Sequence, residues 1–198
     1  MEETMQSNKI QVKSFSIEGK GVFATRDFAK GQMVCFFSGK KIGIAALKKN
    51  YAKKTIRIDD PFQVSGRTYL LLDKPFAFMN HSCAPNGGFR GKTRLVALPD
   101  IHAGDEITFD YSLTEWSDDK AWGIDWLNEW HFECSCSAKT CRKIVRMFPF
   151  LPAKTREKYD RWGLVRKDIR TKWHQSLAEP PVGSPGRRKV KSPFRQAD

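Results

Sequence analysis

"FMNHSCAPNGGFR", residues 78–90, places an Asn-His pair and a cysteine between large apolar residues and two glycines. An exposed loop has no need of the cysteine, and a strand buried in an apolar core would not favour the Asn-His pair. The combination indicates a loop that holds a ligand or a metal. It also raises the question of which groups would accompany Cys83.

A second cysteine segment supplies candidate partners. "CSCSAKTC", residues 134–141, places Cys134, Cys136 and Cys141 in the spacing C-x-C-x4-C. Three thiolates so close together in an intracellular chain usually bind a soft metal, most often Zn²⁺. Tetrahedral zinc needs four ligands, and Cys83 can be the fourth if the fold joins the two segments. The alternative is a chance spacing of partly buried free thiols.

Length and composition predict an intracellular globular protein. The 198 residues suffice for one well-cored domain with extensions or for two small domains, and 40% of them are hydrophobic. The chain has no apolar run of roughly 18 residues, and its N-terminus lacks the apolar stretch of a signal peptide. We therefore expect no membrane association and reduced cysteines, with Cys35 of "MVCFF" an inert core thiol.

Positive charge is concentrated at the C-terminal end. The net charge is +13, and residues 142–198 contribute 16 Lys and Arg against 5 Asp and Glu. Such a segment fits contact with a polyanion such as DNA, and a solvated lysine-rich surface is the alternative.

Short runs rich in Val, Ile, Phe and Tyr predict several small sheets between Phe15 and Tyr111. These runs are "GVFAT" (21–25), "MVCFFSG" (33–39), "RTYLLLD" (67–73), "RLVALPD" (94–100) and "EITFDY" (106–111). One helix is expected among them, at residues 44–54. The predicted class is mostly β with an α-helical C-terminal extension.

Helical patterns follow Tyr111. Ser117 is a candidate cap for a helix that carries Trp122, Trp126 and Trp130 along one face. We interpret this stripe as packing, with a lid over a peptide groove or a partner surface as alternatives.

Two further helices and a tail are expected beyond the second cysteine segment. The first would start at Pro152, direct Tyr159 and Trp162 inward and end at Gly163. Val165, Ile169 and Trp173 mark the second helix. The composition from about Leu177 predicts a disordered tail.

Five motifs, taken in order, resemble those of the SET-domain protein lysine methyltransferases with a post-SET zinc motif. They are "GKGVFA" (19–24), "FFSG" (36–39), "FMNHSCAPN" (78–86), "AGDEITFDY" (103–111) and "CSCSAKTC" (134–141). The resemblance covers roughly residues 15–146 and implies small antiparallel sheets with a pseudoknot, in which the Tyr111 segment threads beneath the preceding loop. It divides the chain into an N-terminal lead (1–14), a SET domain (15–112), a Trp-rich helical insertion (113–131), a post-SET zinc motif (132–146), C-terminal helices (147–176) and a disordered basic tail (177–198).

The resemblance also implies S-adenosylmethionine as cofactor and a protein lysine as methyl acceptor. Lys20, Gly21 and Val22 would contact the cofactor through main-chain atoms, and Asn80 and His81 through side chain and backbone, respectively. Tyr111 would be catalytic and would also contact the cofactor. The walls of the lysine channel would be Phe37, Phe78 and Phe109. Zinc would be held by Cys83, Cys134, Cys136 and Cys141.

Phe109 and three departures from the family pattern bear on the degree of methylation and on the reaction rate. Where family members carry Phe two residues before the tyrosine, the resemblance implies di- and trimethylation. The departures are Phe37 where Tyr is frequent, Phe78-Met79 where Arg-Phe is usual, and Lys143 where Gly commonly follows Cys-Arg. They put rate and product in doubt more than fold.

Three functions compete at this point. The leading one is a lysine methyltransferase acting on a histone tail or another basic chromosomal protein, with the basic segment contacting DNA or the nucleosome. The second is a catalytically inactive SET module that binds a lysine peptide or chromatin. The third is a zinc-stabilised nucleic-acid binder. The expected location is intracellular: nucleus or chromosome in a eukaryote, and cytoplasm otherwise.

Overall fold

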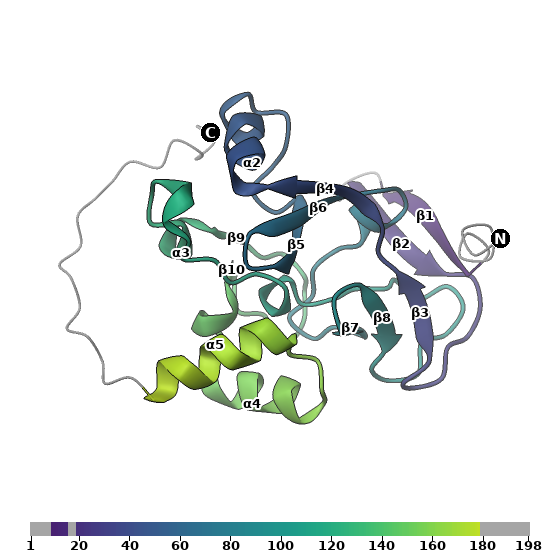
Figure 1. Cartoon of the computed structure of the whole chain (residues 1–198). Helices are drawn as coiled ribbons and strands as arrows, with labels where there is room; N and C mark the ends of the chain where they lie inside the picture. The colour runs from purple at the N-terminus through teal and green to yellow at the C-terminus, as the bar shows by residue number, and fades with distance from the viewer. Residues whose placement is uncertain (1–8, 16–18, 179–198) are drawn as a thin grey trace.

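Short antiparallel strands are the main regular elements of the computed structural model up to residue 97 (Figure 1). The structure describes residues 9–15 and 19–178. Strands β1 (Ile10–Phe15) and β2 (Gly19–Ala24) pair as a two-stranded sheet, and two three-stranded sheets have the orders β3-β8-β7 and β4-β6-β5. Their strands are β3 (Met33–Phe36), β4 (Gly39–Gly43), β5 (Pro61–Ser65), β6 (Thr68–Leu72), β7 (Gly87–Arg90) and β8 (Arg94–Ala97).

An aromatic core lies between these sheets. The Phe37 ring meets Phe89 edge-on with centroids 4.8 Å apart, and it meets Phe109 in the same way at 5.6 Å. Edge-to-face packing of this kind adds to the hydrophobic burial of the rings. Cys35 is also buried here, and its burial raises the pKa of the thiol to about 12, as expected of an inert core cysteine.

The segment from Asp105 to Phe109 is enclosed between β2 and the loop of residues 80–87. On one side, the Ile107 N–H donates to the Val22 carbonyl at 2.7 Å. On the other, the Ser82 N–H donates to the Phe109 carbonyl at 3.1 Å. The expected strand at 106–111 therefore forms only isolated bridges, because the segment is divided between two partners. This is the threaded arrangement that the pseudoknot requires.

The tryptophan stripe does not form one helix, so that expectation was wrong. Gly123 has a left-handed φ of 73°, which ends the turn η3 (Lys120–Trp122) before α3 (Trp126–Glu129) begins. Ser117 is buried and accepts a 2.9 Å hydrogen bond from Trp122 Nε1 rather than capping a helix. The rings of Trp122 and Trp126 stack at 3.9 Å and pack against α2 (Ile44–Ala52), as the packing interpretation predicted.

The C-terminal helices lie at the lower edge of the molecule in Figure 1 and pack against Leu113 and Trp116. β9 (His131–Glu133) pairs with β10 (Ile144–Arg146). The C-terminal helices are α4 (Ala153–Arg161) and α5 (Lys167–Ala178). The 3₁₀ turns not yet named are η1 (Phe76–Phe78), η2 (Tyr111–Leu113) and η4 (Phe148–Phe150). Tyr159 is 1% exposed, but Trp162 is 45% exposed, which contradicts its predicted inward position. Gly163, with φ 68°, stops α4 as expected.

The predicted tail begins inside α5, since Leu177 and Ala178 belong to this helix, and the rest of it lies outside the described residues. Across residues 9–15 and 19–178, no helix is both long enough and apolar enough to cross a bilayer.

Candidate active site and cysteine cluster

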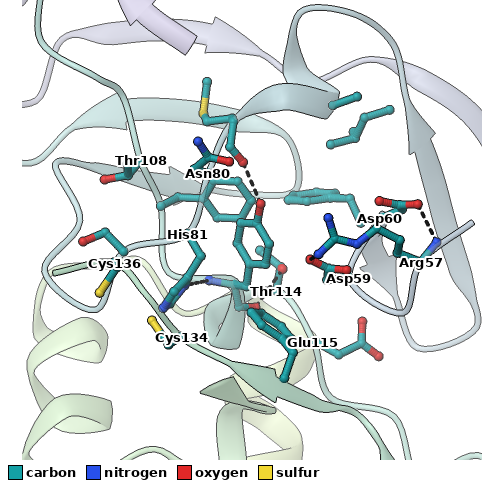
Figure 2. A pocket seen from close by; sticks show the side chains of 18 of the residues that line it. Arg57, Asp59, Asp60, Asn80, His81, Thr108, Thr114, Glu115, Cys134 and Cys136 are labelled. Atoms are coloured by element: carbon teal, nitrogen blue, oxygen red, sulfur yellow. Dashed lines mark hydrogen bonds and ion pairs between the residues drawn. The ribbon is translucent and has the colours of Figure 1, made fainter. Parts of the chain in front are cut away.

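A pocket of about 480 Å³ opens where the threaded segment meets the β9–β10 hairpin. Figure 2 shows Asn80 and His81 on one side of it, Arg57, Asp59 and Asp60 on the other, and Cys134 and Cys136 beside His81. The lining residues come from segments far apart in the sequence. The pocket therefore exists only in the folded chain.

Tyr111 also lines this pocket. Its hydroxyl donates a 2.7 Å hydrogen bond to the Met79 carbonyl, and its backbone N–H donates to His81 Nδ1 at 3.2 Å. Burial, followed by the charge of Asp59, raises the pKa of the phenol above its ordinary value. The hydroxyl is therefore neutral, and its oxygen keeps acceptor capacity because a phenol accepts as well as donates.

Asn80 joins the pocket to β2. Its side-chain N–H₂ donates to the Lys20 carbonyl at 3.0 Å and to Glu106 Oε1 at 2.7 Å. Lys20, Gly21 and Val22 thus lie behind Asn80 instead of lining the pocket. A Cβ at Gly21 would come within 2.5 Å of Glu106 Oε1, so glycine is needed for close approach of this carboxylate.

The aromatic lining differs from the expected one. Phe109 lines the pocket, with its ring 4.7 Å from that of Tyr111, but Phe37 lies one layer deeper and Phe78 packs beside the Lys20 ammonium. Four further rings line the pocket, namely Phe62, Phe76, Trp130 and Phe132. Of these, the sequence singled out Trp130 as part of the tryptophan stripe, and Phe132 carried a signal in its place two residues before Cys134.

Carboxylates were missed altogether. Asp59, Asp60 and Glu115 line the pocket, and burial is the main cause that raises the pKa of Asp59 above its ordinary value. Glu115 Oε1 accepts hydrogen bonds from the Tyr69 hydroxyl at 2.9 Å and from Trp126 Nε1 at 3.4 Å. Burial raises the pKa of Glu115 to about 7. No local motif marks these acids, because only the β5 and β6 packing brings them to the pocket.

The structure brings the four predicted cysteines together. Cys83 Sγ lies 3.8 Å from Cys134 Sγ, and Cys134, Cys136 and Cys141 interact through their sulfurs. With Zn–S bonds of about 2.3 Å, the edge of a tetrahedral site is about 3.8 Å long. The Cys83–Cys134 separation therefore matches one edge of such a site. His81 joins the cluster as well, since its ligand atom and those of Cys83, Cys134 and Cys136 lie within 4.8 Å of one another.

Backbone donors oppose the effect of burial on the cysteines of this cluster, but burial still raises the pKa values of Cys83 and Cys134. Cys83, Cys136 and Cys141 sulfurs each accept a 3.4 Å hydrogen bond from a backbone N–H, donated by Arg142, Cys83 and Lys143, respectively. Although burial opposes the charge, such donors lower the pKa of Cys136 to about 6. Lys143 has φ 64°, a left-handed conformation that favours the glycine common at this place in the family.

His81 contacts the cluster as a donor. Because the Tyr111 N–H donates to Nδ1, that nitrogen carries the lone pair, and the proton of the neutral ring is on Nε2. Nε2 lies 3.3 Å from Cys83 Sγ. Burial lowers the pKa of His81 to about 4, which keeps the ring neutral. The ring thus links the cysteine cluster directly to the backbone of Tyr111.

Known proteins are similar to this chain in sequence. Residues 19–112 match the family model described as the SET domain. The chain is 28% identical over 149 residues to the "Variant-silencing SET domain-containing protein" of Plasmodium falciparum, spanning 67% of this chain and 5% of that protein. It is 30% identical over 144 residues to "Histone-lysine N-methyltransferase trithorax" of Drosophila virilis, spanning 65% and 3%. It is 32% identical over 146 residues to human "Histone-lysine N-methyltransferase 2B", spanning 66% and 5%.

The chain thus spans only a small part of the length of these relatives. The family match ends at residue 112, directly after the threaded tyrosine, so the cysteine segment and the C-terminal helices lie beyond it. Residues 19–112, which include the threaded Tyr111 segment, therefore form a SET domain.

Proposed function

We propose that this chain is an S-adenosylmethionine-dependent protein lysine methyltransferase that acts on a histone or another chromosomal protein. The observation that carries the proposal is the neutral, partly buried hydroxyl of Tyr111, fixed by Met79 in a pocket beside Asn80 and His81. The named histone-lysine methyltransferases among the relatives support the reaction class.

The residues present fit the cofactor. Asn80 and His81 would hold it, with the main chain of Lys20, Gly21 and Val22 behind them. The Lys20 carbonyl and the Glu106 carboxylate offer acceptors for an ammonium group. The Phe132 ring, with its centroid 5.9 Å from that of Tyr111, offers a face for a purine. When bound, S-adenosylmethionine supplies an electrophilic methyl group on a sulfonium sulfur.

Tyr111 has two functions in this proposal. Its oxygen accepts weak C–H···O contacts and so orients the reacting methyl group, and its dipole stabilises the dispersing positive charge. The rings of Phe109 and Tyr111 surround the acceptor amine with apolar surface, which lowers the pKa of a lysine from about 10.4 and favours the neutral nucleophile. Positioning of the two reactants supplies much of the acceleration.

Zinc would be structural. Cys83, Cys134, Cys136 and Cys141 would hold it, and the metal would fix the β9–β10 hairpin, which carries Phe132, against the Asn80-His81 loop. All four protein ligands are thiolates, which leaves no open position for catalysis. Zinc therefore contributes to the shape of the pocket.

Phe109 supports di- and trimethylation as the product state. A hydroxyl at this position would hold water in the space that further methyl groups need, and Phe109 has none. Phe109→Tyr should shift the product distribution toward mono- and dimethyl-lysine, as measured by mass spectrometry of a peptide substrate. Monomethyl-lysine as the sole product of the unchanged protein would contradict this assignment.

The decisive experiment is incubation of the purified chain with labelled S-adenosylmethionine and either histones, nucleosomes or DNA. Transfer of label to lysine is expected. Binding of lysine peptide or nucleosomes without transfer would instead favour the inactive module, for which the intact Asn80, His81 and Tyr111 offer no support. Binding of DNA alone would favour the nucleic-acid binder. For an active enzyme that contacts chromatin, a nuclear location is expected.

A further inference from the structure

The carboxylate of Asp110, the residue before Tyr111, accepts four hydrogen bonds. It is fully buried. Its two oxygens accept one 2.7 Å hydrogen bond each from the Arg142 guanidinium, and Oδ2 accepts a further one of 2.9 Å from the Tyr159 hydroxyl. Oδ1 also accepts from the Ser112 N–H at 3.1 Å and so fixes the turn that contains Tyr111.

The two side-chain donors come from segments beyond the family match. Arg142 directly follows Cys141, and its own backbone N–H donates to Cys83 Sγ. Tyr159 lies on α4 and is 1% exposed. One carboxylate therefore joins the Tyr111 turn, the cysteine cluster and the first C-terminal helix.

A buried charge needs this full set of partners. Burial of an unpaired carboxylate costs free energy of folding. Removal of one hydrogen-bond donor would leave part of the Asp110 charge without a partner in an apolar interior. Although burial lowers it, hydrogen bonds and attraction from Asp110 leave the pKa of Arg142 above its ordinary value, so this side chain is charged. Burial and then the Asp110 charge raise the pKa of Tyr159, so its hydroxyl is protonated and donates.

We propose that Tyr159 and Arg142 are positioning residues for Tyr111. They hold Asp110, Asp110 holds the turn of residues 111–113, and this turn sets the direction of the phenol. The helix α4 is thus part of the catalytic unit, although it lies outside the residues that the family shares. The expected effect on kcat rests on the proposed methyl transfer, whereas the expected effect on the order of the 111–113 turn does not.

Tyr159→Phe tests the proposal, because it removes one hydroxyl and retains the ring that packs in the core. The matched control is Trp173→Phe on α5, which loosens the same helical core without contact to Asp110. Three quantities are compared for the full chain: kcat and KM on a lysine peptide, hydrogen exchange of residues 108–114, and zinc content. Tyr159→Phe should lower kcat roughly tenfold with little change in KM and speed local exchange.

The control should lower the melting temperature but leave kcat and the exchange of residues 108–114 unchanged. Arg142→Lys provides a second variant, since lysine keeps the charge but loses the bidentate geometry, and it should reproduce the kinetic defect. Equal effects of Tyr159→Phe and Trp173→Phe would overturn the inference, because they would mean loss of stability only. If the unchanged chain transfers no methyl group, the proposed function fails, and the exchange measurement alone still decides whether Tyr159 holds the turn.

Discussion

At the scale of single residues, Tyr111 and Glu115 show how burial sets the chemistry of the pocket. Tyr111 is protonated and its hydrogen is used by the Met79 carbonyl, which leaves its oxygen as an acceptor. Glu115 is buried against Tyr69 and Trp126, which donate to the same oxygen. A substitution at each of these two side chains therefore tests the role of one side-chain oxygen.

Tyr111→Phe removes the acceptor and keeps the ring. We expect binding of S-adenosylmethionine to persist and kcat to fall by about a hundredfold or more, as for a lost transition-state group. Calorimetry of cofactor binding and steady-state kinetics measure the two quantities. A rate near that of the unchanged protein would rule out the assigned role.

Glu115 predicts a pH dependence of stability. Its pKa is raised from 4.5 to about 7 in the folded chain, a difference that corresponds to roughly 3 kcal/mol. Between these two pH values the folded state binds more protons than the unfolded state, so the free energy of unfolding falls as pH rises and the loss is complete above pH 7.

Glu115→Gln should remove this dependence, since glutamine resembles the protonated acid and still accepts from Tyr69. The variant should match the unchanged protein near pH 4.5 and be more stable by up to about 3 kcal/mol at pH 8. Urea unfolding at both pH values provides the comparison. Parallel stability curves for the two proteins would show that another group accounts for the trend.

At the scale of elements, the β9–β10 hairpin is where the cysteine cluster and the pocket meet. Phe132 on β9 lines the pocket, and Cys134 lies two residues after it in the sequence. The Cys134 N–H donates to the Lys143 carbonyl at 2.7 Å and closes the loop that carries the other two cysteines. Loss of metal from this loop should therefore displace Phe132.

Cys136→Ser should lose the metal and weaken cofactor binding together. One zinc per unchanged chain is expected by elemental analysis, and the serine variant should bind substoichiometric zinc, because the alkoxide that would replace the thiolate is not available at neutral pH. Cys35→Ser is the matched control, since Cys35 is buried far from the hairpin in the aromatic core. Metal-free protein with full activity would refute the structural role of zinc.

At the scale of the whole molecule, the net charge of the chain and the charge of the pocket lining have opposite signs. The chain carries +13 overall, yet the pocket is lined by Asp59, Asp60, Glu106, Glu115 and Glu133 against Arg57. A pocket with this lining can accept a basic peptide in spite of the basic surface around it. Residues 142–198 carry 16 positive against 5 negative residues, and those not paired within the fold, as Arg142 is with Asp110, are the candidates for contact with DNA under the proposed function.

Deletion of residues 179–198 removes five Lys and Arg and two Asp and Glu while it leaves α5 intact. We expect a lower rate on nucleosomes at moderate salt and an unchanged rate on a free peptide, because a tether raises the local concentration of a DNA-bound substrate only. The ratio of the two rates, measured at two salt concentrations, is the readout. An equal fall in both would show that this segment belongs to the catalytic fold.

Sequence alone determined the features that short motifs encode. The order of "FMNHSCAPN", "AGDEITFDY" and "CSCSAKTC" sufficed for the fold class, the threaded tyrosine and the cysteine group, because each motif places its key residues within a few positions. Local rules also placed α2 and the stop of α4 at Gly163. They failed at Trp122 and Trp130, where helical spacing was present but the left-handed Gly123 broke the helix.

Only the tertiary structure decided which side chains meet. Phe62, Phe76, Asp59 and Glu115 reach the pocket through sheet packing, and Phe37 packs behind the lining ring of Phe109 and against Phe89. The convergence of Arg142 and Tyr159 on Asp110 has no sequence signal, since these residues are far apart in the chain and common in type. A motif fixes spacing along the backbone, whereas burial of a charge requires partners that long-range packing alone can deliver.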